Sequence, residues 1–351
     1  MRKIIITILL IGFISMPAYA NEIPQDFLET LPFDAGNGSI EDVENSYYHI
    51  VDNVKETMAA EMKNIMVKAR DILLMCGVCA VAAILVKTSE DNKGLKIIEI
   101  AGVTLLLMMC LADTETIIYQ SKDAIGKIGL FSKILLPLFA TWASCAGKPL
   151  SSVFITSGAM AYTNICCLLA EKLIFIYIIA YILLKIAGEV TENKISSGIA
   201  DCMKNTMLFL VKACLMGVSF YMTMSGCIVS AGDSVAMKTT KAAVSILPGV
   251  GTAVAGVTES VISGAAVIRN SVGVLGTIAI ICFVSEPFIR CFLNMAVFKI
   301  ISVISASFTS EMMSTALKTL ADGYSIALGM LAAVSGGIIM AIAVSVSIFG
   351  G

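Results

Sequence analysis

The sequence has little charge and almost no histidine. Only 14% of its 351 residues are Asp, Glu, Lys or Arg, well below the roughly 25% of soluble domains. A formal net charge of −2 provides no basic surface for nucleic acid. The single histidine, His49, cannot supply a histidine-rich metal site. Nucleic acid is therefore not an expected partner, and a histidine-based metal centre is not expected.

The sequence also lacks the residue sets that common catalytic mechanisms need. No Ser-His-Asp or Cys-His set can form around His49, and no phosphate-binding GxxxxGK[ST] motif is present. Eleven cysteines occur, but Cys76, Cys79, Cys166 and Cys167 lie in apolar segments, where thiols behave as small hydrophobes. We therefore expect no enzymatic activity and no cofactor, and we interpret the cysteines as packing residues.

Apolar residues instead make up 58% of the chain, and its mean hydropathy is +0.90. Because a membrane-spanning helix needs about 20 residues, the chain has room for roughly seven to nine transmembrane or re-entrant helices. We predict an all-α, polytopic integral membrane protein. The apolar segments are residues 72–86, 95–112, 128–146, 153–170, 173–188, 207–231, 246–268, 272–284, 291–307 and 325–349.

The first twenty residues resemble a secretory signal peptide. Two basic residues precede an apolar run over residues 4–14, and Ala18 and Ala20 occupy the small-residue positions of a cleavage site. Cleavage would leave Asn21 as the mature N-terminus, outside the cytoplasmic membrane. The alternative is an uncleaved first helix, for which the apolar run is short. No cysteine follows Ala20, so a lipoprotein anchor is not expected there.

Residues 21–70 form an acidic segment of ordinary soluble composition. Ser39 followed by Asp42 resembles a capping box, and apolar residues then recur at spacings of three and four up to Ile65, which predicts an amphipathic helix. This helix either lies on its own membrane domain or binds an external partner. Lysines follow the first apolar segment, as expected if residues 21–70 are extracytoplasmic and residues 71–351 form the helical membrane domain.

The glycine-rich residues 246–268 either span the membrane or re-enter it. On a helix, Thr252, Glu259, Ser263 and Asn270 fall on one line, with valines opposite. A carboxylate is costly against lipid, so this polar stripe is a candidate subunit contact or aqueous path. Small residues at four-residue spacing equally favour close helix packing.

Seven further charged residues lie in or beside apolar segments. Most are near the ends of predicted helices, where long side chains reach the membrane interface. We interpret these as snorkelling side chains without a mechanistic role. They are Glu99, Lys133, Lys185, Lys212, Glu286, Arg290 and Lys299.

A longer pattern extends over residues 233–276. It consists of acidic, basic, proline and glycine positions in a fixed order: Asp233, Lys238, Lys241, Pro248, Gly251, Glu259, Arg269, Asn270, Gly273 and Gly276. In order and spacing this pattern resembles the signature region of the stage III sporulation protein AE family, a polytopic membrane family of endospore-forming bacteria. The signal peptide, the acidic segment and the helical remainder also resemble that family.

The resemblance implies a non-enzymatic subunit of the transenvelope channel that links mother cell and forespore. The implied location is the mother-cell membrane around the forespore. The implied partners are other membrane and ring-forming subunits and a cytoplasmic secretion-type ATPase. Apart from the resemblance, membrane lipid is an expected partner, and a homo-oligomer is kept as an open alternative. A stand-alone secondary transporter remains the alternative, with the proline and glycines breaking a helix to bind solute. We find no internal repeat to support it. An intramembrane enzyme would need a reactive partner for Glu259.

Overall fold

The computed structural model describes residues 31–32, 40–87, 92–145, 149–244 and 251–347. Within these residues all regular structure is helical, which confirms the predicted all-helical class. The predicted cleavage site at Ala18, Ala20 and Asn21 lies outside the described residues, as does Pro248 of the signature. Cleavage therefore stays a prediction.

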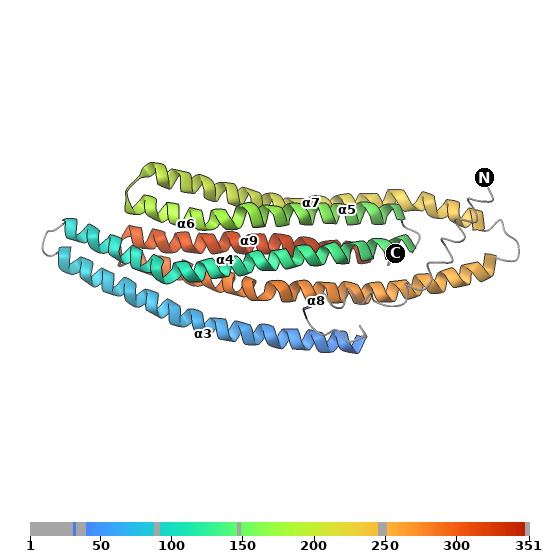
Figure 1. Ribbon diagram of the computed structural model, residues 1–351, viewed down its shortest axis with the longest axis horizontal. Helices are drawn as coiled ribbons and strands as arrows, with labels where there is room; N and C mark the ends of the chain where they lie inside the picture. Colours follow the sequence, from blue (N-terminus) through green and yellow to red (C-terminus); the bar gives the residue numbers. More distant parts are fainter. Residues whose placement is uncertain (1–30, 33–39, 88–91, 146–148, 245–250, 348–351) are drawn as a thin grey trace.

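The helices lie side by side along one axis (Figure 1). We call each long helix, or each stack of helices joined end to end, a rod, and successive rods run in opposite directions. One rod is interrupted by a π-helical turn, η1, which joins two α-helices end to end. The elements are α3 (Ile40–Lys87), α4 (Asn92–Cys145), α5 (Pro149–Leu169), η1 (Ala170–Ile174), α6 (Phe175–Val190), α7 (Lys194–Val244), α8 (Gly251–Ser305) and α9 (Glu311–Ser347).

Six helices in the described part of the chain are long and apolar enough to cross a membrane. This supports the multi-pass membrane character, whereas the described residues do not confirm the expected number of seven to nine helices. The difference arises because polar residues at 113–127 and 285–290, which we expected to separate spans, lie inside the continuous helices α4 and α8. The expected boundary between residues 70 and 71 likewise lies inside α3.

The turn between α6 and α7 shows how tightly successive rods are joined. The amide of Asn193 donates to the carbonyl of Gly188, and that of Glu192 donates to Glu189, the two bonds of a Schellman motif. Glu192 takes the left-handed position with φ 53°, which glycine usually fills. A Cβ atom on Gly188 would lie 2.8 Å from the Ser197 amide nitrogen, so only glycine allows this close approach.

Helix α9 lies at the centre of the bundle, where it contacts α4, α5, α6, α7 and α8. Tyr324 and Phe298 are fully buried, and their rings stack at 5.7 Å between α9 and α8. Helix α3 has its main contacts with α4 and α8 alone. The bundle therefore has a well-packed centre and one lateral helix at its edge.

The rods are much longer than a bilayer is thick. The 55 residues of α8 correspond to about 80 Å of helix, whereas the hydrocarbon core of a membrane measures about 30 Å. The last part of α7 and the first part of α8 project past the ends of α4 and α5 (Figure 1). The backbone of residues 233–244 and 251–276 belongs to these two helices, so most of the signature pattern lies on the α7–α8 hairpin.

Candidate functional site

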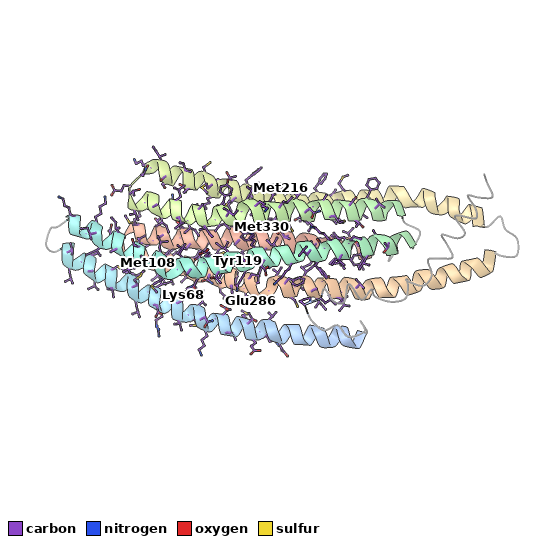
Figure 2. All side chains as sticks on the ribbon, in the orientation of Figure 1. Lys68, Met108, Tyr119, Met216, Glu286 and Met330 are labelled. Atoms are coloured by element: carbon purple, nitrogen blue, oxygen red, sulfur yellow. The ribbon has the colours of Figure 1, made fainter. Side chains whose placement is uncertain are left out.

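Charged and amide side chains on five helices form two clusters, one joining α3, α4 and α8 and one joining α7 to α9. We call this set the polar girdle: Glu61 and Lys68 on α3, Asp113 and Gln120 on α4, Lys204 on α7, Glu286 and Arg290 on α8, and Asp322 on α9. In Figure 2, Lys68 lies left of the middle of the long axis, and Tyr119 and Glu286 lie closer to the middle. Ionisable groups at membrane depth are costly unless they are paired, so such a set is a functional-site candidate.

Arg290 is the hub of the girdle. Its guanidinium lies 2.8 Å from the Glu61 carboxylate and 3.2 Å from that of Glu286. It also donates to the side-chain oxygen of Gln120 at 2.8 Å. One side chain thus joins α8 to both α3 and α4, with the planar, multi-donor geometry that makes arginine suited to buried ion pairs.

The local sequence of α8 places Arg290 for this role. Glu286 precedes it by four residues, the spacing and order at which an acid and a base stabilise a helix. Pro287 lies between them and has no amide hydrogen to donate to the preceding turn. In that turn the Ser285 hydroxyl donates to the carbonyl of Cys282 at 3.1 Å. The helix continues through these polar residues without ending.

A cavity of about 450 Å³ opens beside this hub, between α3, α4 and α8. Lys68 and Asp113, which pair at 2.6 Å, line it together with Arg290 and Asn294. Asn294 is 4% exposed, and its side-chain oxygen and the Arg290 Nε are buried without a hydrogen-bond partner. Buried polar atoms normally have partners, and a polar cavity of this size has room for water molecules to supply them.

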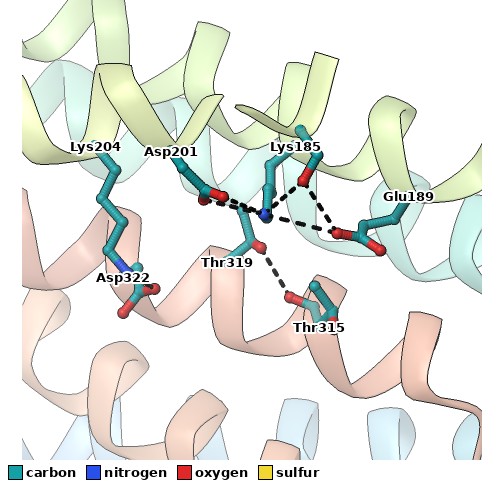
Figure 3. A network of polar contacts seen from close by, with 8 residues as sticks. Lys185, Glu189, Asp201, Lys204, Thr315, Thr319 and Asp322 are labelled. Atoms are coloured by element: carbon teal, nitrogen blue, oxygen red, sulfur yellow. Dashed lines mark hydrogen bonds and ion pairs between the residues drawn. The ribbon is translucent and has the colours of Figure 1, made fainter. Parts of the chain in front are cut away.

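A second polar network ties α6, α7 and α9 together (Figure 3). Lys185 lies 3.0 Å from Asp201 and 3.6 Å from Glu189, and donates to the Ser197 hydroxyl at 2.7 Å. The nearby Lys204 and Asp322 join α7 to α9 at 2.5 Å. Lys185 is 15% exposed, so the ion pairs cover most of this ammonium group.

The girdle continues to the centre of the bundle through a buried hydroxyl pair. The Thr114 and Tyr324 hydroxyls lie 2.8 Å apart, and Thr114 also lies 2.7 Å from the carbonyl of Cys110. Since the threonine hydroxyl donates to that carbonyl, the tyrosine hydroxyl donates to Thr114. This bond connects α4 with α9 between the two charged networks.

The chemistry available to this site is that of charge and hydrogen bonding. Among the described residues, no group of three or more His, Cys, Asp or Glu could hold a metal ion. The contacts of Arg290, Lys68 and Asp113 join α3, α4 and α8, and a polar cavity opens between these three helices. The pair of Lys204 and Asp322 joins α7 to α9. The site can therefore act as a structural clamp, or as a hydrated pocket for a small polar solute.

The predicted polar stripe is separate from the girdle in sequence. Thr252, Glu259, Ser263 and Asn270 lie on the helical backbone of α8, but their side chains are outside the described residues. The same holds for Arg269 on α8 and for Asp233, Lys238 and Lys241 on α7. A contact or path at these residues stays a prediction.

The structure describes the surroundings of two glycines of the signature pattern, Gly273 and Gly276. A Cβ atom on Gly273 would lie 2.8 Å from a methyl group of Val346, and one on Gly276 would lie 3.0 Å from Leu135. These two positions let α8 approach α9 and α4 closely. Gly273 and Gly276 are therefore helix-packing residues.

Sequence reasoning missed most of the girdle. We interpreted Lys185, Glu286 and Arg290 as snorkelling residues, whereas all three are in interhelical or intrahelical ion pairs. The four-residue spacing of Glu286 and Arg290 within an apolar stretch was the available signal. No local signal identifies Glu61 or Gln120 as partners, because both lie on other helices.

Comparisons with known proteins agree with the pattern over residues 233–276. The family described as stage III sporulation protein AE matches residues 37–348. The chain is similar to stage III sporulation protein AE of Bacillus subtilis (strain 168), with 20% identity over 234 residues. That alignment covers 66% of this chain and 59% of the relative, so the chain matches less than two thirds of the relative's length. No solved structure matches the chain.

Proposed function

Because this chain belongs to the stage III sporulation protein AE family, we propose that it is a non-enzymatic platform or conduit subunit of a transenvelope channel linking mother cell and forespore. Its family, together with the six long apolar helices among the residues that the structure describes, makes it a sporulation-associated multi-pass membrane protein. Our proposal goes beyond this class of protein by assigning the chain a role in a channel or secretion complex.

The observation that carries this proposal is the presence of two apolar belts, one on each side of the girdle. A bilayer with a core of about 30 Å covers only one belt of a bundle whose longest rods measure about 80 Å. Large apolar surface outside the lipid marks a protein interface. The first belt exposes Leu74, Val78, Val81, Leu85, Leu105 and Met108; the second exposes Leu130, Phe154, Ile165, Phe209, Met216 and Phe220.

The girdle suits such a platform because it fixes the helices against one another. Arg290 joins three helices, and Lys204 joins two others through Asp322. Removing either partner of such a pair leaves a charge without compensation. The bundle can therefore present both belts in a constant arrangement to neighbouring subunits.

We place the mature N-terminus and the α7–α8 hairpin on the extracytoplasmic side. The N-terminal end of α3 and this hairpin lie toward the same end of the bundle (Figure 1). The hairpin would then contact ring-forming subunits between the two membranes. The opposite end, with the α6–α7 turn, would face a secretion-type ATPase in the mother-cell cytoplasm.

Site-specific photo-crosslinking tests the proposal. A photoreactive residue is placed at Val81 in the first belt and at Phe209 in the second, in sporulating cells, with the buried Leu331 as control. We expect one belt to give adducts with membrane subunits of the channel complex, the other to give lipid adducts, and Leu331 to give neither. Lipid adducts alone from both belts would refute the platform.

The cavity beside Arg290 is the observation that favours the alternative, a permease for a small solute. Its charged lining and unpartnered Asn294 oxygen fit a polar ligand. Solute uptake by the purified protein in vesicles would support this function. The platform would be favoured if the purified protein showed no uptake, or if uptake required the other subunits of the complex.

A further inference from the structure

A second cavity, of about 540 Å³, lies between α4 and the junction of α5 with η1. It falls in the size range of ligand pockets. Its wall combines three lysines, a glutamate and two leucines: Lys122, Lys127, Lys133, Glu171, Leu130 and Leu168. Neither the girdle nor the predicted stripe includes any of these residues.

The charges in this cavity are only partly neutralised. Lys127 pairs with Asp123 at 2.8 Å. Within the described chain, Lys122, Lys133 and Glu171 make no ion pair within 4.0 Å. Lys133 and Glu171 thus line one cavity as a cation and an anion that do not touch, which leaves room for a ligand carrying both charges.

Exposed apolar side chains form part of the cavity wall. Leu130 is 65% exposed and Leu168 is 58% exposed, and both belong to the second apolar belt or adjoin it. Tyr119, which is 69% exposed, also lines the cavity. Tyrosines of this kind are enriched where membrane meets water. The ligand that fits is an amphiphile with a charged head and an apolar tail.

The backbone explains why the cavity is open and how its charges are ordered. Gly126 and Gly129 line it without side chains, and a Cβ atom on Gly126 would lie 3.5 Å from a carboxylate oxygen of Glu171. Helical side chains lean toward the N-terminus of their helix, so Lys133 leans back toward Gly129. Glu171 belongs to η1, and π-helical turns within α-helices are frequent at functional sites.

We propose that this cavity binds the headgroup of an aminophospholipid of the phosphatidylethanolamine class. The Lys133 ammonium pairs with the lipid phosphate, and the Glu171 carboxylate pairs with the headgroup amine. The acyl chains lie along Leu130 and Leu168.

The charge balance favours this lipid over the other common classes. An anionic headgroup without an amine would bring a second negative charge close to the half-buried Glu171 carboxylate and offer it no cation. A quaternary ammonium carries no N–H to donate to the carboxylate. The inference does not depend on the channel role, because it concerns the bundle and the bilayer alone.

Lipid titration of the purified full-length protein in detergent, followed by native mass spectrometry, tests the site. The probes are short-chain phosphatidylethanolamine, phosphatidylglycerol and phosphatidylcholine, together with glycerophosphoethanolamine, which has the headgroup without acyl chains. The variants are Lys133→Gln, Glu171→Gln and Gly126→Leu, which fills the cavity without changing its charge. Lys299→Gln removes an exposed lysine on α8 and is the matched control.

We expect the wild type to prefer phosphatidylethanolamine. Loss of one charge-assisted bond should weaken binding about tenfold or more: for both phosphatidylethanolamine and phosphatidylglycerol in Lys133→Gln, and for phosphatidylethanolamine alone in Glu171→Gln. Gly126→Leu should weaken both lipids, and Lys299→Gln neither. Helix content by circular dichroism shows whether each variant is folded.

Three outcomes would overturn the inference. The first is equal affinity of the wild type for all three lipids. The second is unchanged phosphatidylethanolamine binding in both Lys133→Gln and Gly126→Leu. The third is equally tight binding of glycerophosphoethanolamine, which would make the cavity a site for a soluble phosphate ester.

Discussion

The guanidinium of Arg290 lies 2.8 Å from the carboxylate of Glu61 and thereby joins the centrally packed α8 to the lateral α3. The two side chains are 25% and 18% exposed, so water screens this pair less than a surface salt bridge. The pair of Lys68 and Asp113 joins α3 to α4 in the same region. Both pairs therefore attach α3 to the bundle at the point where its sequence changes from polar to apolar.

Arg290→Gln should destabilise the protein by about 1.5–3 kcal/mol, the range for hydrogen bonds to charged groups. The loss leaves Glu61 without its ion-pair partner. Denaturant unfolding of the detergent-solubilised protein measures the change. Glu61→Gln combined with Arg290→Gln should cost less than the sum of the two single variants, and strict additivity would show that the two groups are not coupled.

Tyr324→Phe should destabilise the protein by about 1 kcal/mol because it removes the bond to Thr114 while keeping the buried ring. Tyr324→Ala should cost several times more, since it also empties the stack on Phe298. Thermal unfolding of both variants provides the comparison. Equal losses would mean that the hydroxyl, and not the ring, dominates.

Adjacent glycines in α9 should respond oppositely to alanine. A Cβ atom on Gly337 would overlap the ring of Tyr162, whereas one on Gly336 would meet nothing within 4 Å. Gly337→Ala should therefore cost about 1–3 kcal/mol through overpacking. Gly336→Ala should be neutral or stabilise by up to about 1 kcal/mol through helix propensity. Equal shifts in the melting temperatures of the two variants would contradict the close contact between Gly337 and Tyr162.

The ion pair between Lys96 and Glu192 should make stability depend on pH in the acid range. The hydrogen bond from the Lys96 ammonium, and then its charge, hold the pKa of Glu192 below its ordinary value. A lowered pKa means that the pair stabilises the fold above the ordinary carboxylate pKa of about 4.3. This stabilisation is lost as the pH falls through the lowered value.

Lys96→Gln should therefore lower the melting temperature slightly at pH 7 and not at pH 3. High salt should reduce the difference at pH 7, because the pair is exposed at the α6–α7 turn. A variant that is equally destabilised at both pH values would show that Lys96 acts by packing.

Glu259→Gln tests the polar stripe of α8. On the conduit interpretation this variant keeps normal abundance but impairs sporulation, while Val257→Leu on the opposite face has little effect. Spore counts and immunoblots of membrane fractions measure both properties. Normal sporulation, or failure only through loss of the protein, would make the stripe a packing surface.

The sequence by itself determined the class of this protein. Low charge, long apolar segments and a periodic pattern from Ile40 onward are local properties, and each acts directly on helix formation and on solvent preference. The signature pattern over residues 233–276 identified the family for the same reason, since spacing along one chain is visible without the fold.

Only the tertiary structure decided where the spans end and which charges meet. A run of polar residues such as 113–127 is compatible with a loop or with one face of a continuous helix. The choice depends on partners such as Lys68 and Arg290 on other helices. Local periodicity sets the face of each helix but not the register between antiparallel rods. The pairing of Arg290 with Glu61 therefore became visible only once α3, α4 and α8 were packed together.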